Sequence, residues 1–229
     1  MPYLFMDYYY IILVIPAMIL ALWAQYKVKS TYNKFSKVEN SRRITGAYAA
    51  QAILTYYGIT DVRIEQTSGS LTDHYDPKSK VIRLSEGVYN STSIAAVGIA
   101  CHEAGHAAQH AEEYKPIKIR NMLIPVCNIG STLGIPLALL GYFFGFEPLV
   151  AIGLLLYSAI ALFQLVTLPV EFDASKRAIA VIGDRRLLAD DEVDSAKKVL
   201  FAAAMTYVAS LVVALANLLR LILRFRRRN

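Results

Sequence analysis

Four uncharged apolar runs divide the chain into membrane-length segments with polar segments between them. The first run, residues 8–24, is long enough to cross a bilayer as a helix. Residues 121–146 and 148–170 form two further runs separated by a very short turn, which predicts a transmembrane hairpin. A fourth run covers 199–219 and is followed by an arginine-rich tail. The pattern therefore predicts an integral membrane protein.

The polar stretch after the first run predicts a small unit of mixed α and β structure. Apolar residues recur at helical spacing over 38–57, and alternating segments at 62–66 and 80–84 predict two strands joined by a polar, turn-rich loop. Good N-cap residues precede a further apolar run, so we expect a second helix from about 92 to 113. The expected fold class is a mainly α membrane protein with about four membrane helices and a small α+β domain.

Composition supports this fold class and indicates the partners. Apolar residues make up 55% of the chain and charged residues 18%, below the quarter or so that is typical of soluble domains. The formal net charge is +6, but the basic residues cluster beside apolar runs, at 27–37 and at 220–228. Basic residues in such positions favour anionic lipid. We therefore expect contact with the lipid bilayer and no nucleic-acid partner.

The same basic residues predict an orientation in the membrane. The lysines at 27–37 place the polar unit in the cytoplasm, and the hairpin turn at 145–148, which has no basic residue, then lies outside. A full fourth span would put the arginine-rich tail outside, against the same rule. Either the last helix is re-entrant or interfacial, or the tail is an exception. Asp7, with no basic residue before the first run, favours an uncleaved anchor over a signal peptide.

The strongest chemical signal is an HExxH pattern, His102-Glu103-Ala104-Gly105-His106, on the second predicted helix. Residues four apart on an α-helix differ by about 40° of rotation and roughly 6 Å of rise, so both imidazoles can reach one metal ion. Their nitrogens suit Zn²⁺, and a third protein ligand would leave the fourth position to water. Glu103 lies off the ligand axis, where its carboxylate can accept a proton from that water.

The alternative interpretation is a solvated helix face that carries these residues by chance. The flanking residues are apolar and small, which predicts burial, and a buried Glu between two His without a metal would cost roughly several kcal/mol. Gly105 inside the motif suits close packing or substrate access. Cys101 points away from the imidazole face and Cys127 lies in an apolar span, so neither closes a four-ligand structural site. The pattern favours a catalytic site with one Zn²⁺ per chain.

The third ligand has to come from elsewhere in the chain. His110 lies two helical turns from His102, about 12 Å along the axis, which is too far to converge on one ion. His74 lies in a polar loop, where it could serve as a ligand or as an oxyanion donor, and we favour an exposed loop residue.

Glu171 is the better candidate for the third ligand. It follows the third apolar run, so it emerges at the membrane surface on the same side as His106 if the hairpin returns as expected. A solvated helix end is the alternative explanation. Asp173 lies beside it and could orient a ligand imidazole through a hydrogen bond.

The segments HEAGHAAQHAEEY and PVEFDASKRA resemble the YugP-type neutral zinc metallopeptidases of bacterial membranes, and the resemblance covers most of the chain. More distantly, the chain is similar to the heat-shock membrane protease HtpX and to the CAAX prenyl endopeptidases. In these gluzincins a Glu on a later helix completes the zinc site. The resemblance implies His102, His106 and Glu171 as the zinc ligands and Glu103 as the catalytic base.

The resemblance has two further implications. The relatives place an Asp four residues after the ligand Glu, whereas this chain has Ser175 at that position. Either Asp173 orients a ligand imidazole in its place, or the residues that hold the ligands in position differ from those of the relatives. The resemblance also implies a zincin-like core in which residues 80–84, with Ile82 at the centre, form an edge strand of a short sheet. Such a strand would pair with extended substrate and bind its main chain whatever the side chains are.

We therefore expect the protein to be a membrane-bound zinc endopeptidase of the bacterial plasma membrane, with its active site facing the cytoplasm. Its substrates would be peptides or proteins, and the HtpX resemblance implies quality control of membrane proteins. The alternatives are an intramembrane site-2-type protease and a non-catalytic membrane adaptor with a structural metal.

In chain order we expect a membrane anchor over 1–26, a metallopeptidase core over 27–120, a transmembrane hairpin over 121–170, a third-ligand segment over 171–198 and a C-terminal membrane helix with a basic tail over 199–229.

Overall fold

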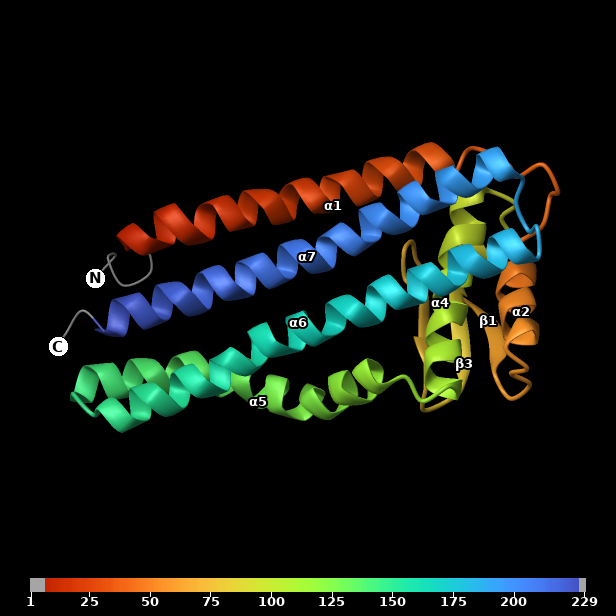
Figure 1. Cartoon of the computed structure of the whole chain (residues 1–229). Coiled ribbons are helices and arrows are strands. Elements are labelled where there is room, and N and C mark those ends of the chain that lie inside the picture. Colours follow the sequence, from red (N-terminus) through yellow and green to blue (C-terminus); the bar gives the residue numbers. More distant parts are fainter. Residues whose placement is uncertain (1–6, 227–229) are drawn as a thin grey trace. The chain divides into compact units, whose positions relative to one another are not determined.

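The computed structural model describes residues 7–226, which divide into two compact units (Figure 1). The membrane unit contains the chain up to Gln25, Lys118–Leu168 and the chain from Met205 onwards, and the α+β unit contains Tyr26–Ile117 and Pro169–Ala204. Helices dominate, and the sheet within the described residues has three strands. The expected fold class, a mainly α membrane protein with a small α+β domain, is confirmed.

Four helices within residues 7–226 are long and apolar enough to cross a membrane. They are α1 (Ile15–Phe35), which continues the π-helical turn η2 (Tyr10–Val14), α5 (Lys115–Phe144), α6 (Glu147–Asp184) and α7 (Asp190–Arg226). The turn between α5 and α6 is very short, as expected for a hairpin. A Cβ added at Gly141 would lie 2.6 Å from the backbone nitrogen of Val150, and one at Gly130 would collide with the carbonyl of Leu156. Glycines therefore let the two helices pack backbone to backbone.

Within the membrane unit, an ion cluster joins the start of the described chain to the end of α7. The Asp7 carboxylate accepts hydrogen bonds from Arg220 at 3.0 Å and from Arg224 at 2.8 Å. The Arg220 guanidinium also lies over the ring of Tyr10, 4.8 Å from its centroid. All three charged side chains are mostly buried. Helix α7 is continuous and long enough to cross a membrane, and Asp7 neutralises two of its arginines in part.

The sheet of the α+β unit corrects one expectation. Its order is β1-β3-β2, in which β1 (Arg63–Thr67) pairs parallel and β2 (His74–Asp76) pairs antiparallel with the central β3 (Val81–Ser85). The segment around Ile82 is therefore the middle strand and not an edge. Ile82 pairs with Ile64 on one side and with Tyr75 on the other, and its side chain is fully buried, so the expected free edge at Ile82 is wrong. The polar loop between the two expected strands supplies the unforeseen third strand, β2.

The first helix of the α+β unit, α2 (Gly46–Tyr56), begins later than the apolar pattern predicts. The Asn40 side chain accepts a hydrogen bond from the Ile44 backbone nitrogen and donates to the Ile44 and Thr92 carbonyls, which holds the preceding residues in a turn. Thr45 then caps the helix by accepting from the Tyr48 backbone nitrogen at 3.2 Å. A side chain that binds the backbone has displaced the start of the helix.

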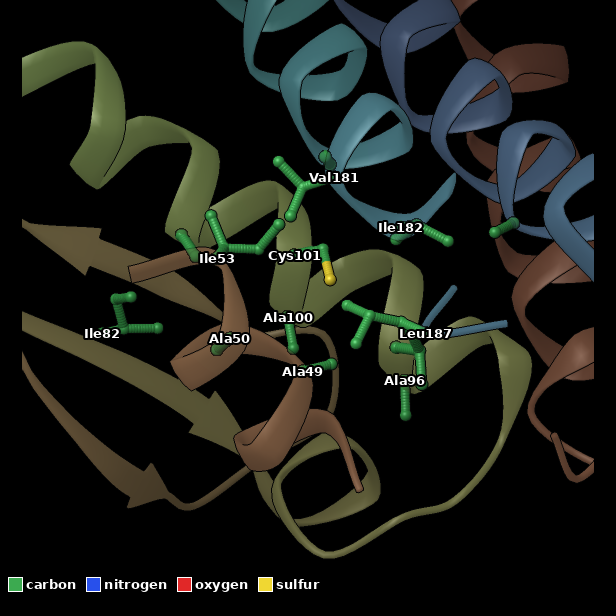
Figure 2. Close-up of a cluster of buried hydrophobic side chains, with 14 of the residues drawn as sticks. Ala49, Ala50, Ile53, Ile82, Ala96, Ala100, Cys101, Val181, Ile182 and Leu187 are labelled. Carbon is green, nitrogen blue, oxygen red and sulfur yellow. The ribbon is translucent and has the colours of Figure 1, made fainter. Parts of the chain in front are cut away.

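The core of the α+β unit forms where α2, α6 and the sheet surround the helix α4 (Ile94–Ala111). The short helix α3 (Glu86–Tyr89) leads from β3 toward it. Figure 2 shows the side chains of Ile53 from α2, Cys101 from α4 and Val181 from α6 gathered in this core. Because apolar side chains cover most of its circumference, α4 is a rigid support for the HExxH residues that it carries.

Candidate metal centre

Helix α4 carries the HExxH motif and presents one partly exposed stripe. Ser93 begins the helix as expected, because its hydroxyl accepts a hydrogen bond from the Ala96 backbone nitrogen at 3.1 Å. Most of the helix is buried, and its partly exposed positions recur at helical spacing. We call this stripe the open face of α4; it consists of Ile99, His102, Glu103, His106 and His110.

Three side chains converge beside the open face. The Nε2 atoms of His102 and His106 lie 3.3 Å and 3.6 Å from Oε2 of Glu171, which comes from α6. The three potential ligand atoms all lie within 4.8 Å of one another, so the group could hold a metal ion. The Glu171 side chain is 4% exposed, and the two imidazoles are 14% and 12% exposed. The arrangement is a buried carboxylate with two imidazoles that remain open on one side.

Gly105 explains how α6 comes close enough for this convergence. A Cβ at this position would lie 2.7 Å from the carbonyl oxygen of Ala174 and 3.3 Å from its Cα. The first of these contacts is shorter than real Cβ atoms make, so only glycine fits here unless the two backbones move apart. Ala174 lies one helical turn after Glu171, and the absence of a side chain at Gly105 therefore lets Glu171 reach the imidazole pair.

Each imidazole has a hydrogen-bond partner on its Nδ1 side, away from Glu171. Nδ1 of His102 lies 3.1 Å from Oγ of Ser175, and Nδ1 of His106 lies 3.0 Å from Oε1 of Gln109. Partners of this kind hold an imidazole ring in one orientation. Both rings are thereby fixed with Nε2 toward the Glu171 carboxylate.

The contacts of Gln109 also assign the tautomer of His106. Its amide nitrogen donates to the Val170 carbonyl at 2.7 Å and to the Asp173 carboxylate at 2.9 Å, and both of these groups can only accept. The amide oxygen therefore faces His106 and accepts a hydrogen bond from Nδ1–H. Nε2 of His106 then carries a lone pair, as a metal ligand requires. Gln109 is fully buried, so this orientation is enforced by its surroundings.

Asp173 acts through Gln109 rather than on an imidazole directly. Its carboxylate also accepts a hydrogen bond from Nε of Arg177 at 2.6 Å, and Arg177 in turn pairs with Glu112 at the end of α4. The Arg177 guanidinium lies over the rings of Tyr57 and Tyr114. The chain of contacts from His106 through Gln109 and Asp173 to Arg177 ties α4 to α6 beside the cluster.

The electrostatics of the cluster favour a cation. Burial lowers the pKa of the His106 imidazole, but the hydrogen bond to Glu171 and the nearby carboxylates of Glu103 and Glu171 outweigh it, so the net shift is upward. With both imidazoles neutral, these two carboxylates give the site a formal charge of −2. A divalent cation would neutralise this charge, which is otherwise costly to bury.

The other candidates lie outside this cluster. His74 is exposed on β2, and its Nδ1 lies 2.8 Å from the Thr72 carbonyl. His110 packs edge-on against the ring of Tyr75, with ring centroids 5.6 Å apart. Cys101 is fully buried, and burial raises the pKa of its thiol, so it stays a protonated core residue. Cys127 lies in α5, where its thiol donates to the Ala159 carbonyl.

Gln109 is the residue that sequence reasoning missed. It lies three residues after His106, on the same side of the helix, and is a polar residue in an apolar and small-residue segment. A buried amide needs hydrogen-bond partners, so this position could have been singled out from the sequence. Ser175, noted only as a departure from the relatives, contacts His102 directly.

Comparison with known proteins identifies relatives of this chain. The chain is 47% identical over 216 residues to a curated protein of Bacillus subtilis named "Putative membrane protease YugP", and the match covers 94% of this chain and 96% of that protein. No solved structure shows a significant match. Residues 10–226 match the model of a family described as "Putative neutral zinc metallopeptidase". This chain therefore belongs to that zinc metallopeptidase family.

Proposed function

We propose that this protein is a membrane-bound zinc endopeptidase in which His102, His106 and Glu171 hold Zn²⁺ and Glu103 is the general base. The observation that carries the proposal is the convergence of three potential ligand atoms within 4.8 Å. Two of them are four residues apart on α4, and the third, Glu171 of α6, lies 65 residues after His106 in the chain. Membership of a zinc metallopeptidase family supports the choice of metal.

The donor set fits zinc at a catalytic site. Two imidazole nitrogens and one carboxylate oxygen are a known ligand combination for catalytic zinc, with the fourth position left to water or substrate. The imidazoles lie on the open face of α4, so a fourth ligand can approach from outside. Neither cysteine belongs to the cluster, which argues against a closed structural site and hence against the adaptor alternative.

Glu103 carries the proton in the proposed mechanism. Bound Zn²⁺ would lower the pKa of a water molecule and polarise the scissile carbonyl. Glu103 follows His102 directly and lies on the same open face, close enough to His106 to affect its pKa. Its carboxylate accepts a proton from the attacking water and passes that proton to the leaving amine as the peptide bond breaks.

The proposed enzyme is membrane-bound but does not cut within the bilayer. Helix α4 is not among the four membrane-length helices found in residues 7–226, and it is surrounded by α2, α6 and the sheet within the α+β unit. This disfavours the intramembrane alternative. We place the site on the cytoplasmic side of a bacterial plasma membrane, because the lysines at 27–37 follow α1's apolar part. Peptides or proteins, membrane proteins among them, are the proposed substrates.

A single substitution tests the role of Glu103. Glu103→Gln keeps the size and polarity of the side chain but cannot accept the proton, so we expect cleavage of a casein-type substrate to fall by at least about 10²-fold. Zinc content should stay at one equivalent, because Glu103 is not a proposed ligand. The matched control is Glu86→Gln, at an exposed position in α3, which should behave as wild type.

The ligand assignment needs a separate variant. Glu171→Ala removes the carboxylate and should reduce both zinc content and cleavage. Full proteolysis in Glu103→Gln would contradict the assigned base, and full zinc content in Glu171→Ala would contradict the assigned ligand. Wild-type protein that binds zinc but cleaves no peptide would contradict the endopeptidase itself.

A further inference from the structure

A pocket of about 210 Å³ opens in the α+β unit beside the C-terminal half of α4. Helix α4 contributes Ala107, His110 and Ala111, and the remaining walls come from the segment after α2 and from the end of β2 with the turn that follows it. We call this cavity the side pocket. The contacts of the proposed metal ligands do not involve it, so its presence calls for a separate explanation.

The side pocket and the open face of α4 share one residue. His110 belongs to both, and it lies seven residues after Glu103, which places the two side chains on the same stripe about 10 Å apart along the helix axis. Ala107, one turn after Glu103, is also in the pocket wall. A peptide held with its scissile bond beside Glu103 would therefore have a neighbouring side chain within reach of the side pocket.

The lining of the side pocket combines apolar side chains with an ion pair. Ile59, Val62, Pro77, Ala107 and Ala111 are its apolar residues. Lys80 and Asp61, which also line it, form an exposed ion pair with each other, so each of these two charges already has a partner.

Two rings give the pocket an aromatic wall. The rings of Tyr75 and His110 meet edge to face with an interplanar angle of 60°, and both residues line the cavity. Aromatic rings favour this arrangement with one another, so an incoming ring could add to the pair. The cavity is smaller than the roughly 300 Å³ at which ordinary small-molecule sites begin, which suits one large side chain rather than a cofactor.

We propose that the side pocket is a specificity site that receives a large apolar side chain, aromatic or leucine-like, at one fixed position of the peptide substrate. The inference rests on the proposed endopeptidase function and adds to it a class of substrate. Apolar pockets discriminate through the buried area of the side chain, so a large residue at that position should be cleaved at least about tenfold faster, in kcat/KM, than alanine there.

The test compares cleavage profiles of the full-length protein in detergent with zinc. A peptide library varied at each position around the cleaved bond is digested, and the products are quantified by mass spectrometry. Ala111→Phe and Val62→Phe each add a ring to the lining, one from α4 and one from the segment after α2. Each should lower the preference for large apolar residues by about tenfold and leave cleavage of the alanine peptide within about threefold of wild type. The control, Gln51→Phe, adds the same ring at an exposed position of α2 that does not line the pocket.

The outcomes separate this proposal from the function on which it rests. An unchanged preference in both pocket variants, or an equal loss for large and small residues in properly folded, zinc-loaded variants, would overturn the side-pocket proposal alone. Thermal unfolding and zinc content establish that the variants are folded and loaded. If wild type cleaves no member of the library, the endopeptidase function fails first.

Discussion

Gly105→Ala is the substitution for which the structure makes the sharpest prediction. The added Cβ would lie 2.7 Å from the Ala174 carbonyl oxygen, 0.7 Å less than the 3.4 Å at which ordinary contact begins. The obstacle is helix backbone on both sides, so no flexible side chain can move away. The helices α4 and α6 must therefore separate, and α6 carries Glu171 away from the two imidazoles.

The required displacement is large on the scale of metal coordination. Zinc–ligand distances in proteins fall within about 0.2 Å of their usual values, so a shift of several tenths of an ångström disrupts the ligand set. We expect zinc affinity to fall by at least about 10–100-fold, as when groups that orient ligands are removed. Forcing an extra carbon into this contact should also destabilise the fold by roughly 1–3 kcal/mol.

Gly98→Ala is the matched control on the same helix. A Cβ at Gly98 would lie 3.6 Å from the Cβ of Ala196, which is ordinary contact. Because alanine is favoured over glycine inside a helix by about 0.5–1 kcal/mol, this variant should be as stable as wild type or more so. It should also bind zinc as wild type does.

The assay measures zinc affinity by competition with a chelating dye, together with thermal unfolding in detergent. Weakened zinc binding in Gly105→Ala with normal binding in Gly98→Ala is the expected result. If Gly105→Ala bound zinc as tightly as wild type, the close approach of α4 and α6 would not be what positions Glu171, and the reasoning would be refuted.

Two further predictions concern one contact in the α+β unit and one in the membrane unit. Gln109→Leu keeps the side-chain volume but leaves Nδ1–H of His106 without its acceptor, so zinc affinity in the dye competition should fall by about 10–100-fold. An unchanged zinc affinity would mean that the Gln109 amide does not position the His106 imidazole. Asp7→Asn removes the charge that pairs with Arg220 and Arg224, so the thermal midpoint in detergent should fall by several degrees while zinc content stays normal. An unaltered midpoint would show that the ion cluster adds nothing to stability.

The features that could be predicted from the sequence are those determined by residues close together in the chain. The membrane helices follow from long apolar runs, and the bounds of α4 follow from its N-cap Ser93 and its apolar positions to within two residues. The HExxH spacing places both imidazoles on one stripe, because helix geometry alone decides it.

The features that were missed depend on contacts between distant segments. The order of the sheet, with β3 in the middle, is set by pairing with β2, whose three residues carry too short a pattern to be distinguished from a turn. The later start of α2 depends on the contact of Asn40 with Thr92, 52 residues away. The role of Gln109 depends on Val170 and Asp173, which only the folded chain brings beside it.

The cluster of Asp7 with Arg220 and Arg224 has a consequence for how the protein enters the membrane. The residues of the two pairs are 213 and 217 positions apart, so the ribosome makes the aspartate long before it makes either arginine. Helix α1 is therefore synthesised before the arginines that pair with the carboxylate of Asp7. When α7 is made, its arginines meet a counter-ion that is already in place, so this contact within the membrane unit can form only after α5 and α6 have been synthesised.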